Sequence, residues 1–298
     1  MIRGQEAGGE AGADRSVVSR FAPSPTGRLH LGHAFSAIRA HDLAEAAGGR
    51  FLLRIEDIDG TRSRAEHVET ILDDLAWLEL AHEPPVFQSQ RLPLYDAALA
   101  DLRQAGLVYP CFCTRAEIAA SLSAPHGPVA AYPGTCRRLS RREAAARMTE
   151  PHCWRLDMAA ALGAVAGAPL AWHDADAGRV LAEPAGQGDV VLSRKDAPAS
   201  YHLAVTVDDA AQRVTDVVRG IDLFDATHVH RLLQALLGLP TPRYRHHALL
   251  TDAAGHRLAK RHGSPTLASM RAAGIDGRAV ADALREGRLP TGFSASAP

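Results

Sequence analysis

The alternation of apolar and polar positions predicts that the chain opens with two strands, each followed by an amphipathic helix. The first strand ends at a proline-rich turn, and the second ends at the acidic run 56–59. The first helix stops at a pair of glycines, which is typical of a helix end. In chain order the four predicted elements are 16–22, 31–47, 51–55 and 64–80. This order is typical of a parallel sheet, which binds ligands at the carboxyl ends of its strands.

The periodicity weakens between 109 and 192, where cysteines, basic residues, alanines and glycines are frequent. We interpret this segment as a domain inserted between two halves of the sheet. Regular βα alternation resumes with apolar runs at 201–207 and 214–218, a helix near 228–237 and a strand near 248–250. The predicted divisions are a flexible tail (1–16), the first half of the sheet (17–108), the insertion (109–192), the second half (193–265), and a short helical piece around 279–284 with a tail (266–298).

The composition is typical of a globular protein without a membrane span. Apolar residues make up 46% of the 298 positions and charged residues 22%, which excludes a disordered, highly charged chain. No stretch approaches the roughly 20 apolar residues of a membrane helix, and residues 1–16 do not have the pattern of a signal peptide. The net charge is −1, so only a local basic patch could indicate nucleic acid. We therefore expect a cytoplasmic monomer with no membrane partner.

Two short segments far apart in the chain have the chemistry of an ATP site. His30 and His33 open the first predicted helix on either side of Gly32, where backbone N–H groups and the helix dipole attract phosphate. The second segment, 257–261, is a basic loop in which Lys260 could stabilise charge that develops in a transition state. Taken alone, the first segment also fits a surface histidine pair, and the second also fits a basic hairpin loop.

Three cysteines, Cys111, Cys113 and Cys136, are close enough in sequence to form a metal site. A group of thiolates favours tetrahedral zinc, which would here help to fold an insertion with little core of its own. The alternative is a set of reduced, buried cysteines without metal, and Cys153 is interpreted as an ordinary small apolar residue. The arginines that follow fit either phosphate contacts to RNA or a solvated helix face. They are Arg137, Arg138, Arg141, Arg142 and Arg147.

Residues 20–33, RFAPSPTGRLHLGH, and the later segment 53–59, LRIEDID, closely resemble the class I glutamyl-tRNA synthetases. The resemblance extends from about position 20 to position 263. It implies a Rossmann-type parallel sheet as the catalytic core, with an inserted zinc-containing subdomain. In that family the histidines that match His30 and His33 help to stabilise the pentacoordinate α-phosphate while the amino acid carboxylate attacks. Gly32 would let adenine and ribose approach the helix.

The basic segment 257–261, RLAKR, resembles the second signature of that family, Lys-x-Ser-Lys-Ser, in degraded form. Lys260 matches the lysine that contacts ATP. Arg257 replaces a lysine by a cation of different shape, and Ala259 replaces a serine and loses its hydroxyl. The resemblance therefore implies that Arg257 and Lys260 bind ATP, and that Lys260 acts in catalysis together with the two histidines.

The same resemblance implies a glutamate pocket and a fourth zinc ligand. Guanidinium groups pair well with carboxylates, Glu56 would take the α-ammonium group, and Tyr201 would shape the site for the side chain. The implied glutamate-binding residues are Arg20, Phe21, Ala22, Pro23, Ser24, Glu56, Tyr201 and Arg219. The implied ligands of one structural zinc are Cys111, Cys113, Tyr132 and Cys136, with His126 or His152 as alternatives to the phenol. Mg²⁺ would accompany ATP.

Full-length members of that family continue much further beyond their lysine loop, into a region that grips the anticodon. This chain ends at position 298, soon after Arg261, so we expect no anticodon-binding domain. Its layout resembles that of short paralogues that activate glutamate with ATP and transfer it to the queuosine base in the anticodon loop of tRNA(Asp). The implied partners are ATP, L-glutamate and queuosine-containing tRNA(Asp). The alternatives are a glutamate-activating enzyme or nucleotidyltransferase with another acceptor, and a non-catalytic binding protein.

Overall fold

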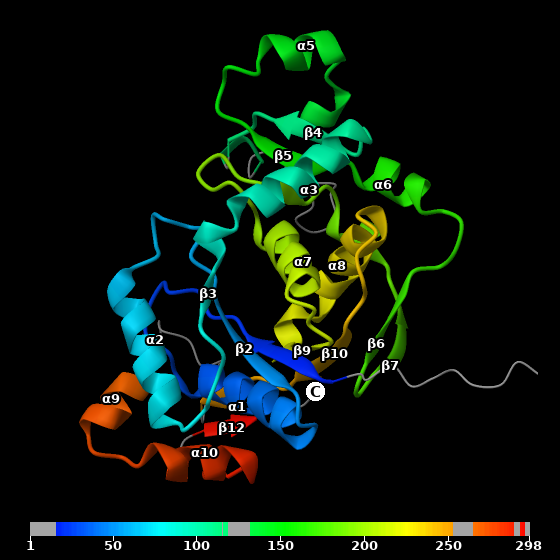
Figure 1. The fold of residues 1–298 in the computed structure, drawn as a ribbon. Helices are drawn as coiled ribbons and strands as arrows, with labels where there is room; N and C mark the ends of the chain where they lie inside the picture. The colour runs from blue at the N-terminus through cyan, green and yellow to red at the C-terminus, as the bar shows by residue number, and fades with distance from the viewer. Residues whose placement is uncertain (1–15, 115, 119–131, 253–264, 289–292, 296–298) are drawn as a thin grey trace, which may run out of the picture.

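The computed structural model describes residues 16–114, 116–118, 132–252, 265–288 and 293–295. Its main strands are β1 Val18–Phe21, β2 Arg50–Ile55, β3 Val86–Phe87, β6 Ala171–Asp174, β7 Gly178–Leu181, β9 Asp216–Gly220 and β10 Arg243–His247. They form a central layer in two halves (Figure 1). The first half is parallel, in the order β1-β2-β3. The second has the order β7-β6-β10-β9, with only the edge strand β7 antiparallel.

The two halves meet where β1 lies beside β9. The Val18 N–H donates to Thr215 Oγ1 at 2.8 Å, and the Thr215 N–H donates to the Val18 carbonyl at 2.9 Å. The ends of the two strands, Phe21 and Gly220, therefore open on the same edge of the central layer. Such a meeting point between two halves of a parallel sheet is where α/β proteins bind ligands.

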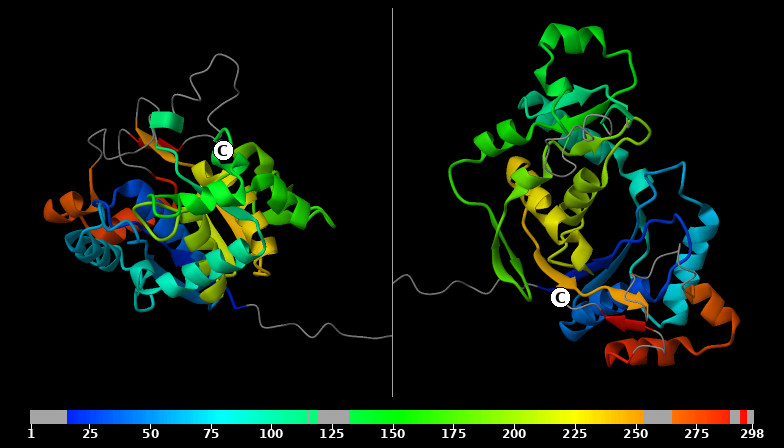
Figure 2. Two further views of the ribbon diagram at one scale, coloured as in Figure 1. Left: turned by 90° about the horizontal axis from the view of Figure 1, so that it is seen from above. Right: turned by 180° about the vertical axis from the view of Figure 1, so that it is seen from behind.

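Helices cover both faces of the central layer (Figures 1 and 2). On one side α1, α2 and α10 form a core with β1 and β2, and on the other α3, α7 and α8 form a second core. The bounds are α1 Leu31–Ala46, α2 Ala65–Trp77, α3 Leu92–Gln104, α6 Met158–Ala164, α7 Tyr201–Ala211, α8 Phe224–Leu236, α9 Leu267–Ala272 and α10 Gly277–Arg285. Within the described ranges, no helix is both long and apolar enough to span a bilayer.

A smaller sheet stands at the upper end of the molecule in Figure 1. It consists of β4 (Val108–Cys111), β5 (Cys153–Leu156) and β8 (Val191–Ser193), which are antiparallel in the order β4-β5-β8. The short helix α5 (Arg141–Ala146) projects beyond it. The segment 109–192 thus contributes to both sheets, because β6 and β7 belong to the central layer.

The α/β fold with a parallel sheet that the sequence predicts is confirmed, and its first four elements are present as β1, α1, β2 and α2. The apolar run at 201–207, which was expected to resume the alternation of strands and helices, lies in the helix α7. Every residue from Leu203 to Asp209 in this helix is buried, so the run lacks the polar face that marks an amphipathic helix. Tertiary packing therefore decides the structure of this segment.

Several elements after position 240 also differ from the prediction. In β10 the buried positions Tyr244 and His246 are not aliphatic, so the strand pattern is weak although Arg243 and Arg245 face solvent. A short strand, β11 (Leu250–Asp252), takes the place of the strand expected near 248–250. The region expected to be one helical piece and a tail contains α9 as well as α10, and its last strand, β12 (Phe293–Ala295), pairs with β11.

Gly49→Ala should lower the free energy of unfolding by about 2 to 3 kcal/mol, because overpacking displaces backbone. A Cβ atom at this position would lie 2.0 Å from the Val17 carbonyl oxygen, between the start of β1 and the turn after α1. Urea unfolding measures the effect. Gly163→Ala is the matched control, since its Cβ would meet nothing within 4 Å. Equal destabilisation of the two variants would contradict this packing.

Candidate active site

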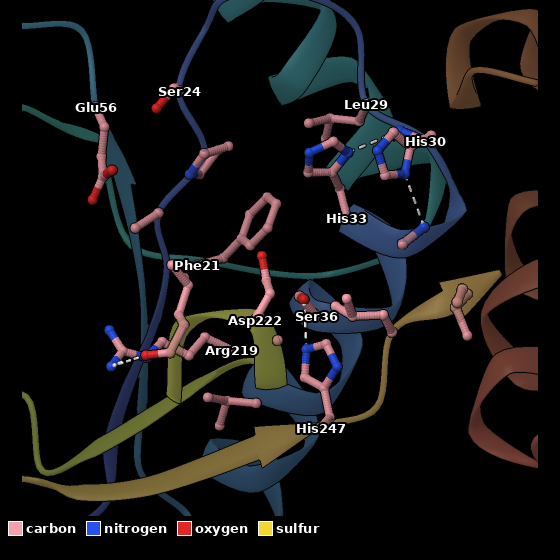
Figure 3. Close-up of a pocket in the computed structure, with 18 of the residues that line it drawn as sticks. Phe21, Ser24, Leu29, His30, His33, Ser36, Glu56, Arg219, Asp222 and His247 are labelled. Atoms are coloured by element: carbon pink, nitrogen blue, oxygen red, sulfur yellow. Dashed lines mark hydrogen bonds between the residues drawn. The ribbon is translucent and has the colours of Figure 1, made fainter. Parts of the chain in front are cut away.

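A cavity of about 360 Å³ opens at the carboxyl ends of β1 and β9 (Figure 3). All the ATP-binding and glutamate-binding residues predicted from the sequence line it, as far as they are described. They are Arg20, Phe21, Ala22, Pro23, Ser24, His30, Gly32, His33, Glu56, Tyr201 and Arg219. Arg257 and Lys260 lie outside the described residues. The fold therefore brings segments that are distant in sequence into one site.

The start of α1 holds the two histidines at the cavity. His30 is the N-cap residue, and its Nδ1 accepts the Gly32 N–H at 3.1 Å. His33 Nδ1 accepts the His30 N–H, also at 3.1 Å, and the ring centroids are 3.9 Å apart. Because both Nδ1 atoms are acceptors, each neutral ring carries its proton on Nε2, from which it can donate to a phosphate oxygen. A Cβ atom on Gly32 would lie 3.0 Å from His30 Cε1, so glycine gives this ring its space.

Arg219 is buried near the end of β9 and uses all the N–H donors of its guanidinium group. The acceptors are His246 Nε2, Tyr201 Oη, His230 Nδ1, the Leu223 carbonyl and Thr227 Oγ1. The longest of these contacts are those of Nη1, at 3.2 Å to Tyr201 and 3.3 Å to His230. None of the acceptors is a carboxylate, so the guanidinium charge is available to an anion in the cavity.

A single carboxylate, that of Asp209 in α7, holds Arg20 and Arg54. Its Oδ1 lies 3.0 Å from Arg20 Nε and 2.8 Å from Arg54 Nη1. Glu56, on the cavity wall, has Oε1 3.7 Å from Arg54 Nε. Burial raises the pKa of the Glu56 carboxyl to about 7, although the charges of Arg54 and Arg20 oppose this shift. The Glu56 carboxyl therefore loses its proton, and gains its negative charge, as the pH rises through about 7.

The cavity also has lining residues that were not predicted, among them Ser36, Gly220, Asp222, His247, Leu249 and Leu250. His247 Nε2 lies 2.6 Å from the Ser36 hydroxyl. A Cβ atom on Gly220 would lie 2.5 Å from Asp222 Oδ1, so a larger residue there would displace the Asp222 carboxylate. The sequence signal that could have indicated Asp222 is its position three residues after Arg219, which was already predicted to bind glutamate. His247 ends the unpredicted strand β10, so no local signal pointed to it.

The predicted cysteine ligands Cys111, Cys113 and Cys136 lie together beside the smaller sheet. Their Sγ atoms are all within 4.8 Å of one another, and those of Cys113 and Cys136 are 3.5 Å apart. Tetrahedral zinc with Zn–S bonds of about 2.3 Å places its sulfur ligands about 3.8 Å apart, so the group could hold a metal ion. Tyr132 Oη lies 3.4 Å from Cys113 Sγ and accepts the Cys136 N–H at 2.9 Å. The phenol is therefore in position to be a fourth ligand.

The surroundings of this group bear on the other ligand candidates. The Arg155 guanidinium lies 4.0 Å from the centre of the Tyr132 ring and helps to fix it. Cys153 pairs with Cys111 across β4 and β5 but is not a member of the group. His152 contacts the Glu150 carbonyl through Nδ1 at 2.9 Å and is likewise outside the group. The other alternative, His126, lies outside the described residues.

The basic residues after the cysteines divide into two kinds. Arg137 pairs with Asp189 at 3.0 Å, and Arg147 pairs with Glu150 at 2.8 Å. These two ion pairs fit a structural role. The other three arginines, at 138, 141 and 142, have exposed side chains at and before α5.

Glu56→Gln should remove part of the pH dependence of stability. The folded-state pKa of about 7 exceeds the ordinary value of 4.5, so between these pH values the folded chain keeps a proton that the unfolded chain releases. The contribution of Glu56 to the free energy of unfolding therefore falls as pH rises through this range. In urea unfolding, the wild type should lose more stability between pH 5 and pH 8 than the variant.

Glu83→Gln is the control for this measurement. The hydrogen bond from Arg50 lowers the pKa of Glu83, so this carboxylate stays ionised between pH 5 and pH 8. The variant should keep the pH dependence of the wild type. An unchanged pH dependence in Glu56→Gln would contradict the raised pKa.

Comparison with known proteins places this site in a family. Residues 16–286 match the family model for class I tRNA synthetases (E and Q), catalytic domain. The chain is 49% identical over 269 residues to the glutamyl-Q tRNA(Asp) synthetase of Rhodobacter capsulatus. This match covers 87% of this chain and 96% of that protein. It is 45% identical over 276 residues to the Symbiobacterium thermophilum protein of the same name, with 89% and 84% covered.

Solved structures agree with these matches. The glutamate tRNA ligase of Elizabethkingia meningosepticum, in complex with its amino acid, is 26% identical with a TM-score of 0.71 over 84% of this chain and 54% of that one. The glutamate-tRNA synthetase of Elizabethkingia anophelis is 27% identical with a TM-score of 0.72 over 84% and 55%. The chain thus spans about half the length of these two structures. On the family match and the close relatives together, the chain belongs to the class I tRNA synthetase (E and Q) catalytic-domain family.

Proposed function

We propose that the chain activates L-glutamate with ATP and transfers it to the queuosine base in the anticodon loop of tRNA(Asp). The observation that carries this proposal is the high identity to the Rhodobacter glutamyl-Q tRNA(Asp) synthetase along nearly all of that protein. The cavity supports it, because its walls offer imidazole donors for phosphate, a carboxylate for an ammonium group and a guanidinium for a carboxylate. As a member of its family the chain is a ligase.

In the first step, the α-carboxylate of glutamate attacks the α-phosphorus of Mg-ATP, and pyrophosphate leaves as glutamyl-adenylate forms. His30 and His33 would donate hydrogen bonds from Nε2 to the phosphate oxygens, which carry most charge in the transition state. Arg257 and Lys260 are proposed to contact the same ATP. No side chain needs to act as a nucleophile, because positioning and charge stabilisation lower the barrier.

The glutamate itself would lie between Glu56 and Arg219. The Glu56 carboxylate would bind the α-ammonium group, and Arg219 would bind a carboxylate, with Tyr201 shaping the site for the side chain. Residues 20–24 would close the pocket from the side of β1. A glutamine side chain would leave the buried guanidinium without a counter-charge, and unpaired buried groups of this kind are a strong source of discrimination.

In the second step, a hydroxyl of the queuosine cyclopentene diol attacks the activated carbonyl carbon, so an ester forms and AMP leaves. The exposed arginines Arg138, Arg141 and Arg142 are proposed to contact RNA phosphates, which would hold the RNA without reading its sequence. ATP, glutamate and tRNA are all present in the cytoplasm, and we expect the reaction to occur there.

We also propose that Cys111, Cys113, Tyr132 and Cys136 hold one structural zinc ion. The fit rests on the three clustered sulfur atoms and on the phenol oxygen beside them. Zinc would link the strand β4 to the segment that begins at Tyr132, and would thereby stabilise the smaller sheet.

The proposed activity predicts ATP–pyrophosphate exchange that depends on glutamate and on no other amino acid. It further predicts transfer of labelled glutamate to queuosine-containing tRNA(Asp). Periodate cleaves vicinal diols, so periodate treatment of the tRNA beforehand should abolish labelling. The control is tRNA(Asp) without queuosine, which should accept nothing.

Three results would contradict the proposal in different ways. Labelling of periodate-treated tRNA that lacks queuosine would exclude the proposed acceptor. Exchange without glutamate would indicate a nucleotidyltransferase. No exchange at all would indicate a binding protein, in which Lys260→Ala changes nothing.

Cys113→Ser should reduce bound zinc from about one ion per chain to a small fraction of that, because structural sites need all their ligands. Elemental analysis of the purified protein measures the zinc. Cys153→Ser is the matched control, since this cysteine lies outside the ligand group, and it should keep its zinc. Wild-type protein without zinc after purification in zinc-containing buffer would exclude the site.

A further inference from the structure

Among the residues that the structure describes, Arg219 has no carboxylate partner, unlike the other buried arginines near the cavity. Arg20 and Arg54 lie 3.0 and 2.8 Å from the Asp209 carboxylate. Arg219 is only 6% exposed, yet within the described part of the chain its hydrogen-bond acceptors are hydroxyl, carbonyl and imidazole groups. A buried charge without a partner is unfavourable unless an anion from outside completes the site.

One imidazole connects Arg219 to a buried carboxylate. His246 Nε2 accepts from Arg219 Nε at 3.1 Å, and His246 Nδ1 lies 2.8 Å from Asp174 Oδ2. The other oxygen of Asp174 accepts the N–H groups of Asp176 and Ala177, at 3.0 and 3.1 Å. Asp174 is 1% exposed. Both carboxylate oxygens therefore have donors, and the group is held in one orientation.

Only one form of the His246 ring fits this arrangement. Its Nε2 faces a guanidinium N–H, which can only donate, so Nε2 must be the acceptor. The ring proton is then on Nδ1 and is donated to Asp174, as expected where a carboxylate sets the tautomer of a histidine. Burial and the charge of Arg219 lower the pKa of His246 to about 4, so the ring stays neutral at physiological pH.

The opposite side of the guanidinium is held more loosely. Its Nη1 donates to His230 Nδ1 at 3.3 Å, and His230 Nε2 in turn lies 3.2 Å from His202 Nδ1. Nη2, by contrast, makes contacts of 3.0 and 2.5 Å with Leu223 and Thr227. Nη1 also donates to Tyr201, which lines the cavity, so a ligand oxygen can replace an Nη1 contact while Nε and Nη2 stay in place.

We propose that Asp174 and His246 are positioning residues for Arg219, which fix the guanidinium group from behind and leave Nη1 to bind a carboxylate of the amino acid. Neither residue lines the cavity, so both act through Arg219 and do not touch the substrate. The inference rests on the proposed function, and it adds residues of β6 and β10 to the machinery that selects glutamate.

Asp174→Asn tests the inference at nearly constant side-chain size. If the amide N–H₂ group of the variant faces His246 Nδ1, the ring proton must move to Nε2, which then points toward Arg219. If the amide oxygen faces Nδ1, the N–H₂ group faces the backbone N–H groups of Asp176 and Ala177 and those bonds are lost. The first change sets two N–H groups against each other at Arg219, and the second removes the backbone bonds that hold residue 174, and through it His246, in one orientation. In glutamate-dependent ATP–pyrophosphate exchange we expect the KM for glutamate to rise about tenfold or more, with kcat and the KM for ATP within about threefold of the wild type.

Asp216→Asn is the matched control. Asp216 is a buried aspartate at the start of β9, the strand that also carries Arg219, and it pairs with Arg243 at 2.7 Å. Among the hydrogen bonds and ion pairs of the described residues, none joins it to Arg219. This variant should keep the wild-type KM for glutamate. His246→Phe is a second test in case Asp174→Asn does not fold, and it should raise the same KM by a similar factor. The double variant should be no worse than His246→Phe alone, because the two residues act through one contact.

The possible results separate this inference from the proposed function. An unchanged KM for glutamate in both single variants, with active wild-type protein, would overturn the inference alone. Equal losses in kcat and in both KM values would also overturn it, because they would show a general structural role. Additive effects in the double variant would show that the residues act independently. Wild-type protein without glutamate-dependent exchange would overturn the proposed function and the inference with it.

Discussion

The Asp209 carboxylate holds guanidinium groups from β1 and β2 against α7, and the geometry of the cavity depends on this contact. Arg54 is completely buried, and the carboxylates of Asp208 and Glu56 lie 3.8 and 3.7 Å from its Nε. Loss of one member of such a buried cluster leaves another charge unpaired, which costs more than the intact cluster contributes. Because α7 follows the smaller sheet in the chain while β1 and β2 precede it, the cluster ties the two halves of the fold together.

The lining of the cavity contains both a basic group without a carboxylate partner among the described residues and an acidic group. Arg20 pairs with the Asp209 carboxylate, whereas the acceptors that Arg219 contacts in the described part of the chain are uncharged. Glu56, which also lines the cavity, gains its negative charge near neutral pH because burial raises its pKa to about 7. A guanidinium group and a carboxyl group in one cavity suit a zwitterion better than a simple anion.

The sequence was most informative where neighbours along the chain determine the structure. The run 20–33 contains the end of β1, the turn and the start of α1, so one motif located half of the residues that line the cavity. Their roles in binding and catalysis remain predictions, as do those of Arg257 and Lys260. His247 and the link from Asp174 to His246 could not be predicted, because they depend on the pairing of β10 with β6 and β9. Those contacts join distant segments whose own patterns are weak.

The pairing of β6 with β10 limits which segments of this protein can be exchanged for those of another protein. β6 and β7 lie within 109–192, but they complete the central layer and not the smaller sheet. A chimaera that exchanged all of 109–192 as one cassette would leave β10 as a bare edge, open to pairing with other chains. A graft that kept the hairpin at 171–181 and exchanged only the parts around the cysteines would leave that edge covered. Modularity in this protein therefore follows strand pairing and not the order of segments in the chain.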